Sequence, residues 1–234
     1  MSNDKENILI FLITKTITEQ KKENKIMDEL LNNILIGMPE GTANLQLPDP
    51  ELRDYYRDEQ DRVFWVDSSI DENLLSLVKM IMRCNREDKD IPDKDRKPIK
   101  VFIDSPGGDI QALYTTIKAI EMSKTPVWTI NYCTAYSAAA DLMASGHKRF
   151  ALKGTNFMVH NGSCNYGGQV DQVESMKKYF DKLSKKVTDN FLDRTRVDPK
   201  VFKKKAVSDW FFDEEEALEM GVIDEIVNSF DILF

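Results

Sequence analysis

The chain has 234 residues, 41% of them hydrophobic, which is enough for one large domain or for a domain with an appendage. Its formal net charge of -8 argues against non-specific binding to nucleic acids or anionic membranes. Its three cysteines, Cys84, Cys133 and Cys164, are widely spaced and predict free thiols; no CxxC or Cys/His cluster indicates zinc.

The first 50 residues differ from the rest of the chain. The apolar run at 8–13 is too short to span a bilayer and has no cleavage site beside it, so we expect a soluble cytoplasmic protein. Apolar residues between 26 and 35 recur at intervals of three and four, which predicts an amphipathic helix. The segments "GMPEG" and "LPDPE" predict a linker at 37–50. We therefore expect an N-terminal arm at 1–50 and a domain at 51–234.

From about residue 55 onward, strand-like and helix-like segments alternate. Expected strands lie at 62–67, 99–104, 126–133, 149–153 and 156–162, and expected helices at 71–85, 108–123, 137–146 and 170–194. Parallel strands need such crossover helices, so the pattern predicts an α/β fold.

Only two histidines are available for acid–base chemistry near neutral pH. His147 lies in the polar turn "SGHKRF", which is typical of a solvated loop. His160 ends the strand-like segment "NFMVH" and is followed by a loop. Because α/β enzymes place functional groups at strand ends, His160 is the better catalytic candidate.

The segment "NYCTAYSAAADLMASG" places Ser137 where a helix is expected to begin. Serine is a favoured N-cap, and the alanines that follow indicate a closely packed helix. A serine held at a strand-to-helix turn is also suited to nucleophilic attack, because the helix N-terminus favours a developing oxyanion. The local sequence alone leaves these three interpretations open.

The segment "FIDSPGGDI" runs from an expected strand into the paired glycines Gly107 and Gly108. Paired glycines allow a tight turn, and they also allow backbone N–H groups to face an anion without side chains in the way. Neither GxGxxG nor GxxxxGKS spacing is present, which argues against a nucleotide site.

Four segments in order, "FIDSPGGD", "AYSAAADLMASG", "FMVHNG" and "DWFFDEEEALEMGVIDEIV", resemble the successive signatures of the ClpP family of caseinolytic serine peptidases. The resemblance extends over about 57–227. It implies a ClpP/crotonase-like spiral of repeated αββ units with a protruding handle helix. It also implies a serine endopeptidase that cleaves peptides or unfolded proteins inside a ring-shaped chamber.

The resemblance assigns the nucleophile to Ser137, the base to His160 and the orienting acid to Asp209. Serine attacks poorly at neutral pH until a histidine takes its proton, and a carboxylate must fix the tautomer of that histidine. The same resemblance assigns the oxyanion-hole N–H groups to Gly108 and Ala138.

The resemblance further implies a substrate groove at Gly107, Asn161 and Gly162, and a homo-oligomer built as a heptameric ring or a stacked double ring. The handle corresponds to 167–194. An AAA+ unfoldase is the implied partner. No metal or other cofactor is expected, and any ATP requirement is expected to lie in that partner.

The sequence departs from the family pattern at several positions. Val207 and Ser208 replace an acidic residue and an arginine that help to pair the rings. In the strand that faces the unfoldase, Phe102 is retained but Lys100 replaces a second aromatic, and Met122 stands at a third aromatic position.

Two further departures concern the unusual arm at 1–50 and Tyr136, which stands where a small residue usually precedes the nucleophile.

The arm and the altered docking strand favour an alternative function, that of a phage-type capsid-maturation protease that acts without an unfoldase. Two more functions compatible with this fold are a non-hydrolytic regulatory ring subunit and a crotonase-type acyl-CoA enzyme. The joint presence of serine, histidine and aspartate argues against both.

Overall fold

The computed structural model describes residues 50–233. Apart from Pro50, the predicted arm, its amphipathic helix and its linker lie outside the described residues. The described chain begins with helix α2 (Pro50–Asp61), where the sequence had indicated only a break. Proline is tolerated in the first turn of a helix because the N–H groups there have no intrahelical acceptor, so this proline starts a helix.

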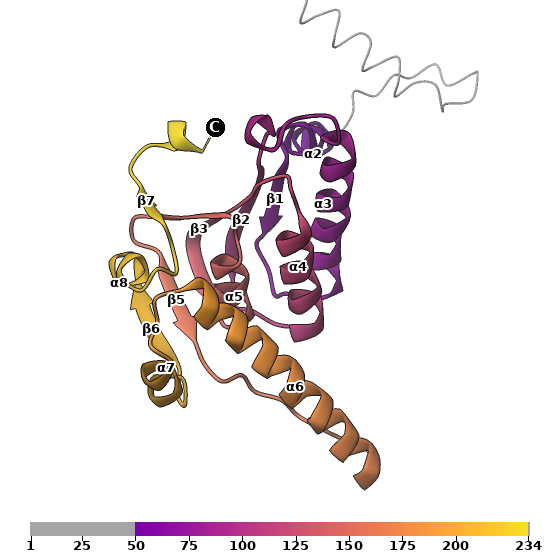
Figure 1. Ribbon diagram of the computed structural model, residues 1–234, viewed down its shortest axis with the longest axis vertical. Coiled ribbons are helices and arrows are strands. Elements are labelled where there is room, and N and C mark those ends of the chain that lie inside the picture. Colours follow the sequence, from indigo (N-terminus) through magenta and orange to yellow (C-terminus); the bar gives the residue numbers. More distant parts are fainter. Residues whose placement is uncertain (1–49, 234) are drawn as a thin grey trace, which may run out of the picture. The chain divides into compact units, whose positions relative to one another are not determined.

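The remaining elements alternate as expected for an α/β protein (Figure 1). The strands are β1 (Val63–Val66), β2 (Ile99–Ser105), β3 (Val127–Tyr136), β4 (Lys148–Leu152), β5 (Asn156–Val159), β6 (Trp210–Asp213) and β7 (Glu225–Val227). The helices are α3 (Leu75–Glu87), α4 (Ile110–Met122), α5 (Ala138–Ala144), α6 (Val170–Arg194), α7 (Pro199–Lys205) and α8 (Glu214–Glu219). Short 3-10 turns lie at Glu72–Leu74, Asp93–Asp95 and Phe230–Ile232.

The long strand β3 organises the sheet. The strand order is β1-β2-β3-β4-β7, and these pairs are parallel. The first half of β3 pairs with β4, whereas its last three residues, 134–136, pair with β5. Strand β6 then pairs antiparallel with β5. The α/β class and the ClpP-like architecture predicted from the sequence are confirmed.

The two faces of this sheet carry separate apolar clusters because side chains alternate along each strand. The larger cluster joins the sheet to α3, α4 and α5, and it includes the fully buried Ile103, Leu142 and Phe157. The smaller cluster lies on the opposite face and is centred on Phe102, Ile130 and Phe150.

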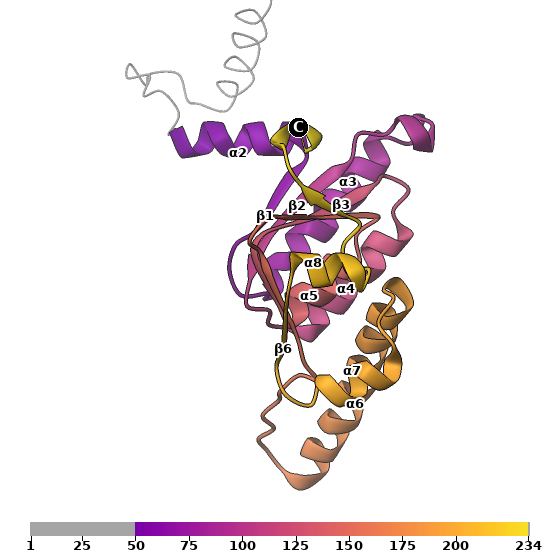
Figure 2. The same cartoon turned by 90° about the vertical axis from the view of Figure 1, so that its left-hand side faces the viewer.

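Helix α6 extends away from the sheet (Figures 1 and 2). Its 25 residues have the bounds that the apolar spacing predicted. Its buried residues, among them Leu183 and Phe191, all lie in its C-terminal half, so the N-terminal half protrudes. The predicted handle, 167–194, includes the whole of α6, and the N-terminal half of the helix is the part of it that protrudes.

Candidate active site

Ser137 stands at the junction between β3 and α5 in a strained backbone conformation. Its φ of 54° and ψ of -124° are unusual for a residue with a side chain. The junction is held from both sides, because the Ser137 N–H donates to the carbonyl oxygen of Met158 at 2.7 Å and its own carbonyl accepts from the N–H of Ala140 at 2.9 Å. Such strain persists only where the surrounding structure fixes it, and it is frequent at reactive groups.

The Ser137 side chain contacts a histidine instead of capping the helix. Ser137 occupies the N-cap position of α5, yet its side chain makes no capping hydrogen bond. Its Oγ lies 2.7 Å from Nε2 of His160 in a hydrogen bond. The capping interpretation of this serine is therefore wrong. The packing interpretation holds for the alanines that follow, since Ala138, Ala139 and Ala140 are all buried.

Asp209 approaches the other nitrogen of the same histidine. Val159 is paired with Trp210 across β5 and β6, so the residue after the first lies opposite the residue before the second. Nδ1 of His160 consequently lies 3.2 Å from Oδ1 of Asp209. The side chain of His160 is 23% exposed and that of Asp209 is 55% exposed, so water reaches the carboxylate more freely than the imidazole.

The glycine turn after β2 packs directly beneath the serine. A Cβ added to Gly107 would lie 2.6 Å from the carbonyl oxygen of Tyr136, 2.8 Å from Cβ of Ser137 and 2.9 Å from the N atom of Ala138. With a φ of 94°, Gly107 also adopts a conformation that disfavours any side chain. Glycine is required here because a side chain on residue 107 would collide with the backbone at 136–138.

The segment before α3 fixes the second glycine. The Ile70 N–H donates to the carbonyl of Gly107 at 2.8 Å, and the Asp109 N–H donates to the carbonyl of Ile70 at 2.7 Å. A Cβ on Gly108 would overlap the carbonyl oxygen of Ile70. No sequence pattern indicated that Ile70 supports the turn, because this pairing is a single bridge outside the regular strands.

Two backbone donors beside Ser137 remain available to a ligand. Among residues 50–233, the N–H groups of Gly108 and Ala138 donate to no other group of the protein. Gly108 directly follows Gly107, on which an added Cβ would lie 2.9 Å from the N atom of Ala138, so the two donors belong to neighbouring segments beside the serine. Free N–H groups at a helix start suit a negatively charged oxygen.

A partly buried acid lies one helical turn after the serine. The Asp141 N–H donates to the carbonyl of Ser137 at 3.3 Å. Desolvation by the surrounding protein raises the pKa of Asp141 from 3.8 to about 8. Asp141 is therefore predominantly neutral at pH 7 and adds little charge to the site.

The other residues singled out in the sequence are placed as follows. His147 lies away from this cluster, and its Nδ1 accepts a hydrogen bond from the N–H of Val127 at 2.9 Å. Asn161 and Gly162 directly follow His160; the Asn161 N–H donates to the carbonyl of Ala206 at 2.8 Å, and Gly162 has a φ of 80°. Within residues 50–233, no group of three or more His, Cys, Asp or Glu side chains is arranged to hold a metal.

Tyr136, the bulky residue before the serine, packs against Phe211. Their ring centroids are 5.5 Å apart and the rings are nearly perpendicular. Local sequence did not predict this contact because β6 is far along the chain. The sequence "WFFD" carried no signal for it, because its three consecutive aromatics show no apolar–polar alternation, whereas the structure buries Trp210 and Phe212 and exposes Phe211.

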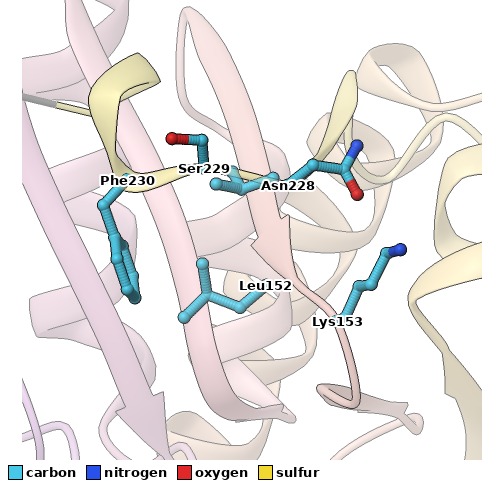
Figure 3. A pocket seen from close by; sticks show the side chains of 6 residues that line it. Leu152, Lys153, Asn228, Ser229 and Phe230 are labelled. Atoms are coloured by element: carbon cyan, nitrogen blue, oxygen red, sulfur yellow. The ribbon is translucent and has the colours of Figure 1, made fainter.

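A separate cavity of about 350 Å³ lies between β4 and the C-terminal turn (Figure 3). Leu152, Lys153, Val227 and Phe230 contribute to its lining. The lining includes none of the residues grouped around Ser137.

The sequence model of the Clp protease family matches residues 56–230. The chain belongs to the Clp protease family. A curated relative from Bacillus licheniformis, named ATP-dependent Clp protease proteolytic subunit 2, is 31% identical over 171 residues, which are 72% of this chain and 87% of the relative. Within residues 50–233, no helix is both long and apolar enough to cross a membrane.

The positions that depart from the Clp protease pattern are now placed in the fold. Val207 is 76% exposed, in the turn before Asp209, and Met122 is 83% exposed at the end of α4. Lys100 is only 7% exposed, on the same face of β2 as Phe102, and burial lowers its pKa. A buried lysine therefore stands in this sheet face where the family pattern has an aromatic residue.

Proposed function

We propose that this member of the Clp protease family is a serine endopeptidase that uses Ser137 as its nucleophile. The 2.7 Å hydrogen bond between Oγ of Ser137 and Nε2 of His160 carries the proposal. A serine that merely capped or packed a helix would not need a histidine at this distance. The strained backbone, which holds the hydroxyl away from its own helix, supports the same role.

In the proposed reaction, His160 accepts the proton of Ser137 as Oγ attacks the scissile carbonyl. The carbonyl oxygen becomes negatively charged and is stabilised by the N–H groups of Gly108 and Ala138. The imidazolium then protonates the leaving amine, and water hydrolyses the acyl-enzyme by the reverse sequence of proton transfers. Asp209 keeps a proton on Nδ1 of His160, and its negative charge stabilises the ring when His160 becomes charged.

We further propose that the chain works as a ring-shaped oligomer and receives unfolded polypeptides from an AAA+ ATPase. The N-terminal half of α6 protrudes and can contact a neighbouring subunit, which supports the proposed oligomer. The aromatic face formed by Trp65, Phe102 and Tyr132 supports partner docking, since Trp65 stacks on Phe102 at 4.6 Å and is 44% exposed. The name of the relative from Bacillus licheniformis agrees with an ATP-dependent system.

Hydrolysis of a short fluorogenic peptide tests the proposed chemistry. The wild type is expected to cleave the peptide without ATP, because a short peptide needs no unfolding. Ser137→Ala is expected to lose the activity. A wild type that cleaves no peptide and forms no acyl-enzyme would contradict the proposal and favour a regulatory subunit.

A further inference from the structure

The sheet face opposite helices α3, α4 and α5 carries a row of apolar side chains. Trp65 of β1 is in register with Phe102 of β2, and Phe102 is in register with Ile130 of β3. Ile130 is in turn in register with Phe150 of β4. Residues in register on neighbouring strands point to the same side of a sheet. The four side chains therefore form one continuous row, here called the 65–150 row.

A residue from beyond the last strand joins this face. Among residues 50–233, every member of the apolar cluster around the row lies in a strand except Leu233, which is 1% exposed. The chain leaves the sheet at Val227, the end of the edge strand β7, and Leu233 follows six residues later. The segment 228–233 therefore turns back over the outer face of the sheet and places Leu233 in the cluster.

The segment 228–233 rests on the sheet through that one buried side chain. Residues 228–232 are all exposed, including Phe230 at 64% and Ile232 at 40%. Within the described part of the chain, the hydrogen bonds of the segment stay inside it or reach back to Ile226. The cavity of about 350 Å³ lies between this segment and the end of β4 (Figure 3). A segment with one buried side chain and only local hydrogen bonds opens at low cost.

The contact of Leu233 limits how strongly the closed arrangement is favoured. Burying one leucine side chain shifts an equilibrium by about 10- to 100-fold. The entropy lost in ordering the segment opposes this contact, so the closed arrangement is favoured by at most about 100-fold. A ligand that binds the open arrangement can shift such an equilibrium.

The 65–150 row also reaches the surface. Trp65 is 44% exposed, and its ring stacks on Phe102 with centroids 4.6 Å apart. A partly exposed aromatic that is continuous with a buried apolar row marks a surface that a further apolar group can cover. Leu233 shows that the cluster around this row accepts a leucine-sized side chain from a short surface segment.

We propose that the segment 228–233 occupies a docking site for an apolar side chain of a partner polypeptide, so that binding at the 65–150 row requires Leu233 to leave. A partner loop that carries Leu, Ile or Phe fits the place that Leu233 fills. This inference rests on the proposed docking of an AAA+ ATPase on the aromatic face and adds competition to it. The apparent affinity of the partner is reduced by the fraction of molecules in which the segment is open.

Binding of a labelled peptide to the full-length protein tests this competition. The probe is a fluorescein-labelled peptide with the sequence of residues 228–233, NSFDIL, and fluorescence anisotropy measures its binding. Leu233→Ser frees the site and should bind the probe about tenfold or more tighter than the wild type does. Phe230→Ser is the matched control, because it changes an exposed apolar residue of the same segment, and it should bind within about twofold of the wild type. A probe with serine in place of its leucine should bind Leu233→Ser about tenfold or more weakly.

Amide hydrogen exchange in the wild type gives a second readout that does not depend on the folding of a variant. The Leu233 N–H donates to the carbonyl of Phe230 at 2.8 Å in the closed segment. An excess of the probe should raise the exchange rate of this amide by about tenfold or more, because the probe displaces the segment.

The outcomes separate this inference from the proposed function. Equal binding of the probe to the wild type and to Leu233→Ser overturns the competition, as does an unchanged exchange rate of the Leu233 amide under excess probe. Phe230→Ser binding as tightly as Leu233→Ser also overturns it, since the effect would then not depend on the buried side chain. None of these measurements involves hydrolysis. A wild type that cleaves no peptide would refute the proposed peptidase function, while the binding results would still decide the competition.

Discussion

Replacing Asp141 with asparagine should stabilise the protein, although aspartate and asparagine have nearly the same shape. Asp141 lies in the first turn of the helix that follows Ser137, and desolvation raises its pKa from 3.8 to about 8. Between these two values the folded protein keeps the carboxyl proton, whereas the unfolded chain releases it. The free energy of unfolding therefore decreases as the pH rises from about 4 to about 8.

The size of the change in the free energy of unfolding follows from the shift in the pKa of Asp141. Each pH unit between the two pKa values changes the free energy of unfolding by about 1.4 kcal/mol. At pH 7 the penalty in the wild type amounts to at most about 4 kcal/mol. Asp141→Asn removes the titrating group, so the stability difference between variant and wild type should be small near pH 4, grow toward pH 8 and then level off.

Urea unfolding at pH 5, 6, 7 and 8, at one fixed protein concentration, measures this difference. Asp193→Asn is the matched control, because it makes the same change on α6, away from the site, and should shift stability by less than about 0.5 kcal/mol at every pH. A gain for Asp141→Asn that does not grow with pH would refute the desolvation argument. A loss of stability would show that the ionised carboxylate has a favourable partner.

Three further predictions concern the site, the glycine turn beside it and an ion pair elsewhere in the domain. Gly107→Ala should lower peptide hydrolysis by about 100-fold or more, because the added Cβ meets the backbone around Ser137; unchanged activity would show that the close packing has no role in positioning the serine. Asp209→Asn should lower kcat by about 100-fold or more with little change in KM, since it removes the carboxylate that we propose orients His160 from 3.2 Å away; an equal rise in KM would instead indicate a role in binding. Arg62→Ala should lower the free energy of unfolding by about 3–5 kcal/mol, measured by urea unfolding, because it leaves the Asp88 carboxylate, 2% exposed, without its bidentate partner; a loss below about 1 kcal/mol would contradict this.

Regular apolar spacing made several elements predictable. The helix at 170–194 was predicted with its observed bounds, because apolar residues recur at intervals of three and four along its whole length. Helix α7 was not predicted, since "PKVFKKK" buries only Phe202 and shows no such periodicity. Its start depends on Asp198, whose side chain caps the first turn.

The sequence indicated which residues form the site but not how the fold brings them together. The sequence motifs indicated Ser137, His160 and Asp209, but their meeting depends on the splitting of β3 between β4 and β5 and on the antiparallel return of β6. The strained backbone of Ser137 and the bridge from Ile70 are three-dimensional features without a local sequence signal.

Labelling with a fluorophosphonate probe, followed by mass spectrometry of the labelled peptide, tests the central claim most directly. The probe reacts with serines that a neighbouring base activates. We expect a single modified residue, Ser137, in the wild type, and we expect labelling to fall by about 100-fold or more in His160→Ala. An unlabelled wild type, or a His160→Ala variant labelled as fast as the wild type, would contradict the assignment of Ser137 as an activated nucleophile.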